Sequence, residues 1–304
     1  MSSLHSIRSF IIDMDGVLWQ GNQPMPGLIE FFQTLRDRQL RFILATNNAS
    51  QTPDQYVAKL AKMGVTISRD EILTSAQAAA LYLKQSLNGN RQHSEKELEN
   101  SLKARVLAGG ANRADAVGER FDQHSSEHGA RVFAIGEDGV RQALTENGFK
   151  LCNLYEVDAQ FVVCGMDRGL SWDKLATATL NIHAGATFIG TNPDTTLPTE
   201  RGITHGNGAI LAALQTATGV APLIIGKPEP LMYQQAMAAL QTDPATTAAI
   251  GDRLETDILG AVRAGIRSVF VLSGISSREQ LTGLDYQPTW VMQNIAEVTQ
   301  ALKE

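Results

Sequence analysis

Two aspartates stand two residues apart at the end of a short apolar run near the start of the chain. The run covers residues 10–12, and Asp13, Asp15 and Gly16 follow it. Such a run is typical of a buried strand, and a glycine allows the turn that swings the second carboxylate toward the first. Because two carboxylates held this close repel each other, a cation is expected between them, and oxygen ligands favour Mg²⁺. An acidic surface turn has the same pattern, so the rest of the chain must separate these two interpretations.

Polar side chains with complementary chemistry follow three further apolar runs. In chain order they are Thr46, Asn47 and Asn48 after residues 41–45, Lys227 after residues 223–225, and Asp252 and Asp257 after residues 247–250. The carboxyl ends of parallel strands meet at one edge of a sheet, so these side chains are expected to share a crevice with the two aspartates. Phosphoryl transfer needs a nucleophile, cations, hydrogen-bond donors for the phosphate and a proton donor. The combined set contains all of these groups.

The elements that would position these groups alternate between strand and helix. Residues 28–35 place their apolar side chains at helical spacing, and residues 52–55 begin another helix with a capping-box pattern. Strand-type and helix-type segments alternate again from residue 206 to the end. This rhythm predicts an α/β fold with a doubly wound parallel sheet, covered by helices on both faces.

The middle of the chain has an alternation of its own, which predicts an inserted domain. The predicted strands are 131–135, 161–164 and 186–189, and the predicted helices are 139–147 and 172–183. A module of this size can form its own core. We therefore expect a core domain in two parts, 1–84 and 204–304, and an inserted domain at 85–203, with a polar and mobile segment at about 88–128.

Four motifs together resemble those of the haloacid dehalogenase superfamily. They are Asp13-Met-Asp-Gly-Val-Leu, Thr46-Asn-Asn-Ala-Ser, Gly226-Lys-Pro-Glu-Pro and Gly251-Asp-Arg-Leu-Glu-Thr-Asp-Ile. The pattern is most similar to the class IIA branch, which contains NagD, chronophin and the phosphatases of phosphoglycolate and 4-nitrophenyl phosphate. The resemblance covers nearly the whole chain and implies a Rossmann-like core with a C2-type cap. The long polar segment at 88–128 departs from the branch.

The resemblance also implies a role for each motif residue. Asp13 would be the nucleophile that forms an aspartyl-phosphate, and Asp15 the general acid and then the general base. The implied phosphate-binding residues are Thr46, Asn47, Asn48 and Lys227. Mg²⁺ would be held by the Asp13 carboxylate, the Asp15 carbonyl and Asp252, with Asp257 behind them.

The substrate's leaving group must be recognised by the cap, because the core motifs address only the phosphoryl group. In the resembling branch, caps contribute substrate contacts and often a dimer interface. Asn192 and Asp194 are therefore expected to contact substrate, although Asx residues also commonly stabilise turns. The implied substrate is a small phosphomonoester of the phosphoglycolate or 4-nitrophenyl phosphate kind; pyridoxal phosphate, sugar phosphates and nucleoside monophosphates are alternatives.

Composition narrows the partners and the compartment. The 304 residues are 43% hydrophobic and carry a net charge of −6, which argues against a nucleic acid or an anionic membrane as partner. Two cysteines form no framework or metal-binding spacing and suit a reducing compartment. We expect a cytoplasmic protein whose partner is a small phosphorylated metabolite.

The alternative function is non-catalytic: a degenerate member that only binds metal, or a receiver-like module that accepts phosphate at Asp13. Asp15 argues against both, because its role is to protonate the leaving group and then activate water. A dehalogenase would need neither this second acid nor a metal. Steady release of phosphate, as opposed to a single labelling event, separates an enzyme from a receiver.

Overall fold

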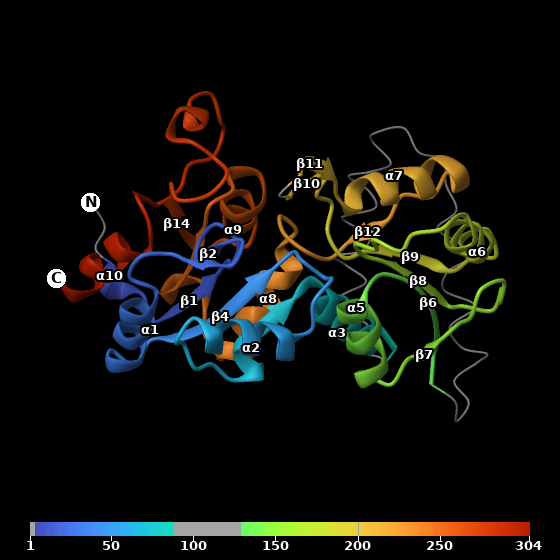
Figure 1. Ribbon diagram of the computed structural model, residues 1–304, viewed down its shortest axis with the longest axis horizontal. Coiled ribbons are helices and arrows are strands. Elements are labelled where there is room, and N and C mark those ends of the chain that lie inside the picture. Colours follow the sequence, from blue (N-terminus) through green and yellow to red (C-terminus); the bar gives the residue numbers. More distant parts are fainter. Residues whose placement is uncertain (1–3, 88–128, 200) are drawn as a thin grey trace. The chain divides into compact units, whose positions relative to one another are not determined.

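The chain forms two compact units. The computed structural model describes residues 4–87, 129–199 and 201–304 (Figure 1). The first unit comprises Met1–Ala78 and Ile225–Glu304, and the second comprises Ala79–Ile224. The polar segment predicted at 88–128 lies outside the described residues. A first unit made of two chain segments, with the second unit between them, follows the predicted organisation.

The first unit is built on a six-stranded sheet in which all neighbours are parallel. In sheet order the strands are β15 (Trp290–Met292), β14 (Arg267–Val271), β13 (Thr247–Gly251), β1 (Ser9–Ile12), β4 (Arg41–Thr46) and β5 (Ile72–Thr74). Every residue of β1 and of β13 is buried. A strand covered on both faces needs an apolar run without alternation, which is what the sequence contains at both places.

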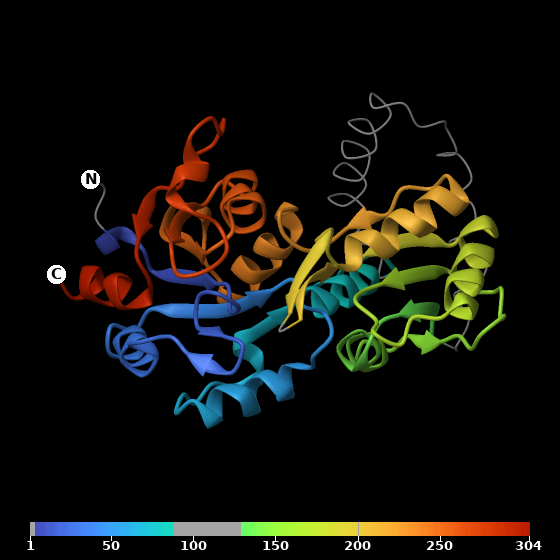
Figure 2. The ribbon, with the colours of Figure 1, turned by 45° about the horizontal axis from the view of Figure 1, so that its top comes forward.

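Helices cover both faces of this sheet. They are α1 (Leu28–Asp37), α2 (Pro53–Lys62), α8 (Pro230–Leu240), α9 (Leu259–Arg263) and α10 (Ile295–Lys303). The helix α3 (Ser75–Leu87) begins in the first unit and continues into the second. Phe10 and Ile12 share a core cluster with α1, α2 and α10. The helix α8 contributes nothing to that cluster but contacts β1 and β4, so it covers the opposite face (Figure 2). The predicted α/β architecture is confirmed.

The second unit has a five-stranded parallel sheet of its own. In sheet order its strands are β12 (Leu223–Ile224), β9 (Thr187–Gly190), β8 (Phe161–Cys164), β6 (Arg131–Ile135) and β7 (Lys150–Leu151). Its described helices after residue 128 are α5 (Asp138–Glu146), α6 (Trp172–His183) and α7 (Asn207–Thr218). Side chains from β6, β8, β9, α6 and α7 share one core cluster.

The predicted boundary at 203 and 204 is wrong, because the second unit continues to Ile224. The apolar run at 223–225 was expected to form a core strand, yet β12 pairs with Ile189 and Gly190 of β9. A Cβ atom on Gly190 would lie 2.7 Å from Leu211 and 2.8 Å from Ile224, so the missing side chain makes room for both. Periodicity identifies a buried strand but does not say which sheet it joins.

The expected return of the chain to the core at residue 204 is also corrected. Strands β10 (Thr196–Thr199) and β11 (Gly202–His205) form an antiparallel hairpin in the second unit. The hairpin lies beside α7 (Figure 2). Within the described residues, no helix is both long and apolar enough to cross a membrane.

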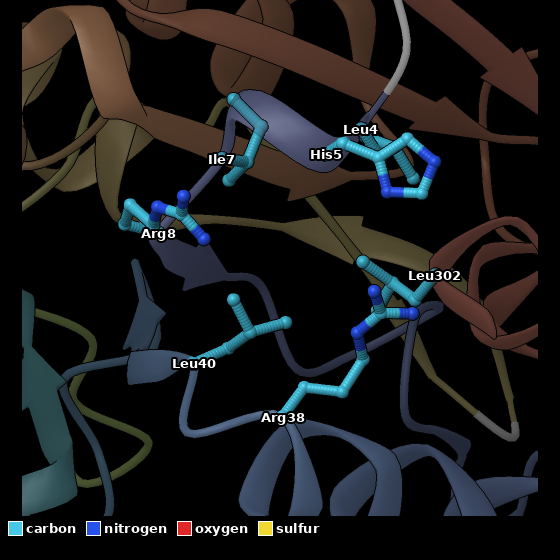
Figure 3. A pocket seen from close by; sticks show the side chains of 7 residues that line it. All are labelled: Leu4, His5, Ile7, Arg8, Arg38, Leu40 and Leu302. Atoms are coloured by element: carbon cyan, nitrogen blue, oxygen red, sulfur yellow. The ribbon is translucent and has the colours of Figure 1, made fainter. Parts of the chain in front are cut away.

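A small hollow on the first unit lies among the N-terminal turn, the end of α1 and α10 (Figure 3). It is lined by Leu4, His5, Ile7, Arg8, Arg38, Leu40 and Leu302. Its volume of about 160 Å³ is below the range of about 300–1,000 Å³ that ligand pockets usually have. None of the predicted site residues lines it.

Two isoleucines of the second unit provide a matched test of its core. Ile189 in β9 is fully buried, whereas Ile203 in β11 is 78% exposed. We expect Ile189→Ala to lower the free energy of unfolding by about 2–5 kcal/mol, because it removes buried methyl groups and leaves a cavity. Ile203→Ala should change it by less than about 0.5 kcal/mol. Urea unfolding measures both; similar losses would contradict the assigned core.

Candidate functional site

Three aspartates converge where β1 and β13 end. Asp13 directly follows β1 and Asp252 directly follows β13, and these strands are neighbours with Ile12 opposite Ile250. The Asp13 amide donates to the Ile250 carbonyl at 2.8 Å. Carboxylate oxygens of Asp13, Asp252 and Asp257 lie within 4.8 Å of one another. The structure therefore brings together three of the predicted site residues.

Lys227 places its ammonium group among these acids. Its Nζ donates to Asp13 Oδ1 at 2.5 Å, to Asp257 Oδ1 at 2.7 Å and to the Ala45 carbonyl at 3.0 Å. These contacts use all three protons of the ammonium group. The lysine side chain is 4% exposed, so the ion pairs are shielded from water.

The backbone of Lys227 is held by Asn47 rather than by a strand of the core sheet. Asn47 Nδ2 donates to the Lys227 carbonyl, and Asn47 Oδ1 accepts from the Lys227 amide, both at 2.8 Å. The preceding strand β12 belongs to the second unit's sheet. Three strand ends of the core sheet deliver site residues, where the sequence predicted four. The side chain of Asn47 supplies the missing support.

A π-helical turn at Leu254–Ile258 presents Asp257. Asp257 Oδ1 contacts Lys227, and its Oδ2 accepts from the Arg253 amide at 3.1 Å. A Cβ atom on Gly251 would lie 2.2 Å from the Asp257 Cβ, so only glycine leaves room for this approach. Such turns are frequent at functional sites.

Asp252 is enclosed by groups that the sequence reasoning missed. Its Oδ2 accepts from the Ile275 amide at 2.7 Å. Cβ atoms on Gly274 and Gly16 would lie 1.8 Å and 2.5 Å from the same oxygen. The available signal was the glycine two residues after the end of the apolar run 269–272, where a parallel strand reaches the same sheet edge.

Burial and like charge set the protonation of the cluster. Burial raises the pKa of Asp13 well above its usual value despite the opposing effect of Lys227, and Asp257 and Asp252 add to the rise. Burial raises the pKa of Asp252 to about 7, with a further contribution from Asp257. Burial opposes the charge on Lys227, but Asp13 and Asp257 outweigh it and raise its pKa. The lysine therefore stays charged.

The cluster fits a divalent cation. When all three aspartates are ionised, Lys227 leaves two negative charges uncompensated, and the oxygens are the ligands that Mg²⁺ prefers. Asp257 Oδ1 is engaged by Lys227, so Asp13 and Asp252 are the residues best placed to hold the ion. The predicted placing of Asp257 behind the metal ligands stays a prediction.

Asp15 has a partner outside the acid cluster. Its Oδ1 accepts from the indole nitrogen of Trp19 at 2.7 Å, and the aspartate itself is exposed. Gly16, with a φ of +84°, begins the turn that joins the two residues. Trp19 was not singled out in the sequence, although it directly follows the last residue of the first motif.

Thr46 and Asn48 shape the loop that follows β4. Thr46 Oγ1 accepts from the Asn48 amide at 3.1 Å. Asn48 Oδ1 accepts from the amide and the hydroxyl of Ser50 at 3.0 and 2.7 Å. Phosphate binding by this loop stays a prediction.

Asn192 and Asp194 belong to a turn of the second unit. Asn192 Nδ2 donates to Asp194 Oδ2 at 2.6 Å, and the Asn192 carbonyl accepts from Asn207 at 2.9 Å. The Asp194 carbonyl accepts from the Gly208 amide at 2.8 Å. These contacts give both residues a structural role before α7, and substrate contact stays a prediction.

Family models and a curated relative match most of this chain. One model, described as haloacid dehalogenase-like hydrolase, covers residues 10–150, and another, described as HAD-hydrolase-like, covers residues 224–298. The chain is 32% identical over 294 residues to the 5'-nucleotidase YutF of Bacillus subtilis, which spans 97% of this chain and 98% of that protein.

Solved structures agree. The glycerol phosphate phosphatase Rv1692 of Mycobacterium tuberculosis, solved in complex with magnesium, is 31% identical, with a TM-score of 0.79 over 100% of this chain and 80% of that one. NagD from Escherichia coli K-12 is 30% identical, with a TM-score of 0.76 over 96% and 98%. The resemblance predicted from the motifs is confirmed: the chain belongs to the haloacid dehalogenase-like hydrolases, in the class IIA branch of NagD-like phosphoric monoester hydrolases.

Proposed function

We propose that this enzyme hydrolyses small phosphomonoesters with Mg²⁺ through an aspartyl-phosphate on Asp13. The observation that carries the proposal is the buried contact between Lys227 Nζ and Asp13 Oδ1 at 2.5 Å. Lys227 occupies one oxygen of Asp13 and leaves Oδ2 to attack phosphorus. The ammonium group compensates the charge of the incoming phosphate, which a buried acid cluster would otherwise repel.

The other residues supply the remaining parts of the reaction. Asp15 gives its proton to the leaving oxygen, and then takes a proton from the water that attacks the phosphoaspartyl group. The Thr46 hydroxyl and the loop containing Asn47 and Asn48 bind the phosphate. Bound Mg²⁺ would supply positive charge to the transferring phosphoryl oxygens, held by Asp13, the Asp15 carbonyl and Asp252.

The substrate is proposed as a small phosphomonoester. YutF is named a 5'-nucleotidase and Rv1692 a glycerol phosphate phosphatase, which supports this class without choosing among its members. A panel of phosphoglycolate, glycerol phosphate, pyridoxal phosphate, sugar phosphates and nucleoside monophosphates would rank them by kcat/KM. Among the candidates that the motif resemblance implies, phosphoglycolate is placed slightly first.

Location and assembly are proposed from composition and chemistry. The net charge of −6 disfavours nucleic acid and anionic membranes as partners, and Cys152 and Cys164 are free thiols, which suits the cytoplasm. A homodimer through the second unit is proposed from the family resemblance. Light scattering of the purified protein would measure its mass.

Asp13→Asn should reduce steady phosphate release by several orders of magnitude, because an amide cannot act as the nucleophile. Release of inorganic phosphate from 4-nitrophenyl phosphate with Mg²⁺ measures the effect. The exposed Asp285 provides the matched control, since Asp285→Asn changes the same group outside the cluster. Near-normal turnover in a folded Asp13→Asn protein would contradict the mechanism, and a single labelling event in the unmutated protein would favour a receiver.

Metal-free protein should become less stable as the pH rises from about 4 to about 7. An unfolded aspartate releases its proton near pH 4, whereas folded Asp252 holds it to about 7. The folded state therefore binds more protons in this window, and stability falls by on the order of 4 kcal/mol, at about 1.36 kcal/mol per pH unit. Asp13 acts with the same sign, and Lys227 titrates far above the window.

Thermal unfolding with EDTA and with saturating Mg²⁺ measures this effect. Mg²⁺ should restore stability at pH 7.5 and have little effect at pH 4.5, because only the ionised acids bind it. Asp252→Asn should flatten the metal-free curve. A flat curve in the unmutated protein would contradict the assigned charge balance.

Asn192→Ala tests the proposed role of the second unit in specificity. If Asn192 contacts the substrate, kcat/KM should fall more for the best substrate of the panel than for 4-nitrophenyl phosphate, whose leaving group needs little recognition. Asn147→Ala is the control, since it too removes a local hydrogen bond donated by a side-chain amide, from Asn147 Nδ2 to the Ala143 carbonyl at the end of α5. Equal losses on both substrates would assign Asn192 to the turn alone.

A further inference from the structure

The contact between Asp15 and Trp19 joins an exposed acid to a buried ring. The indole nitrogen donates to Asp15 Oδ1 at 2.7 Å, and the tryptophan is 0% exposed. The roles proposed for Asp13, Lys227 and the phosphate-binding loop do not involve this bond. It is nevertheless the one side-chain hydrogen bond of Asp15 among the described residues.

The backbone fixes the distance between these two residues. The Gly16 amide donates to the Trp19 carbonyl at 2.8 Å, and the Leu18 amide donates to the Met14 carbonyl at 2.8 Å. The turn reverses the direction of the chain, so that Trp19, four positions after Asp15, faces it. Trp19 then begins β2 (Trp19–Gln20), which pairs with β3 (Gln23–Pro24).

The helix α2 holds the indole ring in one orientation. The Tyr56 ring stacks on Trp19 with centroids 6.3 Å apart and an interplanar angle of 21°. Lys59 Nζ lies 4.2 Å from the centroid of the Trp19 ring, a distance at which a cation is attracted to the ring face. A ring fixed by two neighbours holds its N–H in a fixed direction.

We propose that Trp19 is a positioning residue for Asp15: its indole N–H selects which Asp15 oxygen carries the catalytic proton. This inference rests on the proposed function of Asp15 as acid and base. An indole N–H only donates, so it binds the unprotonated oxygen of a carboxylic acid. With Oδ1 bound to Trp19, the proton is held on Oδ2.

The proton then follows one route through the reaction. As the bond from Asp13 to phosphorus forms and the bond to the leaving oxygen breaks, the Oδ2 proton moves to that oxygen. In the second half, Oδ2 takes a proton from the attacking water, the phosphoaspartyl bond breaks, and phosphate leaves. Asp13 is restored as a carboxylate and Asp15 as an acid.

Trp19→Phe removes the donor and keeps a ring in the core. The readout is kcat/KM, which reports the steps up to phosphorylation of Asp13, for two leaving groups. For an alkyl phosphate such as glycerol phosphate, we expect a fall of about 10- to 100-fold, since a charge-assisted hydrogen bond is lost. For 4-nitrophenyl phosphate, whose leaving group departs without a proton, the change should stay below about 3-fold.

The second half-reaction gives an independent readout. Water activation needs Asp15 for every substrate, so kcat should fall for both, and a burst of 4-nitrophenol close to one per active site should precede the slow phase. A protein weakened only in its packing would lose kcat/KM equally on both substrates and show no burst. Either of these two results would overturn the inference.

Two further variants guard against a trivial loss of folding. β-(3-Benzothienyl)alanine at position 19 replaces the N–H by sulfur at nearly constant shape and should reproduce the Trp19→Phe pattern. Gln20→Ala removes a neighbouring contact of the same hairpin, from Gln20 Nε2 to the Ser273 carbonyl, and should not distinguish the leaving groups. If Gln20→Ala lowers kcat/KM more for the alkyl phosphate than for 4-nitrophenyl phosphate, the effect belongs to the hairpin and the proposed role of the indole is wrong.

Asp15→Asn separates this inference from the function on which it rests. Loss of a general acid typically costs about 10²- to 10⁴-fold, and here the cost should be concentrated on the alkyl phosphate. If Asp15→Asn does not distinguish the leaving groups, the assigned role of Asp15 is wrong. If Asp15→Asn does and Trp19→Phe does not, only the role of Trp19 is wrong.

Discussion

The buried ammonium group of Lys227 is the interaction on which the site depends. Asp13, Asp252 and Asp257 would repel one another in this low-dielectric position, and Lys227 compensates only part of their charge. Such a cluster is unstable without a further cation or a bound proton. Burial, together with the repulsion among these acids, raises the pKa values of Asp13 and Asp252, and the uncompensated charge fits a divalent cation.

The loops at the carboxyl edge of the first unit's sheet have the geometry that this cluster of acids needs. Asn47 hydrogen-bonds both the amide and the carbonyl of Lys227. The lysine therefore reaches the acids although the strand that precedes it does not belong to the first unit's sheet. Gly251 and Gly274 allow Asp257 and Asp252 to approach closely. A wide π-helical turn then aims Asp257 at the lysine. Several loops therefore share one electrostatic constraint.

Asp15 is supported separately from the other acids, by an indole instead of an ammonium group. This separation is chemically useful. A proton donor must give up and regain its proton during each turnover, so it needs a partner outside the cluster of acids that shares the ammonium group of Lys227. The two aspartates lie two residues apart in the sequence, yet they have different partners and correspondingly different proposed roles.

The sequence by itself determined the α/β class, the parallel sheet and the strand ends that carry Asp13, Thr46 and Asp252, because these depend on local runs and turns. Only the tertiary structure decided that the run at 223–225 joins the second unit, since an apolar run fits any buried sheet. It also decided that Asn47 holds Lys227, 180 positions away, and that Trp19 holds Asp15. Hydrogen bonds made by side chains, whether to distant backbone or within a local turn, leave no periodic pattern in a sequence, so spacing alone could not identify them.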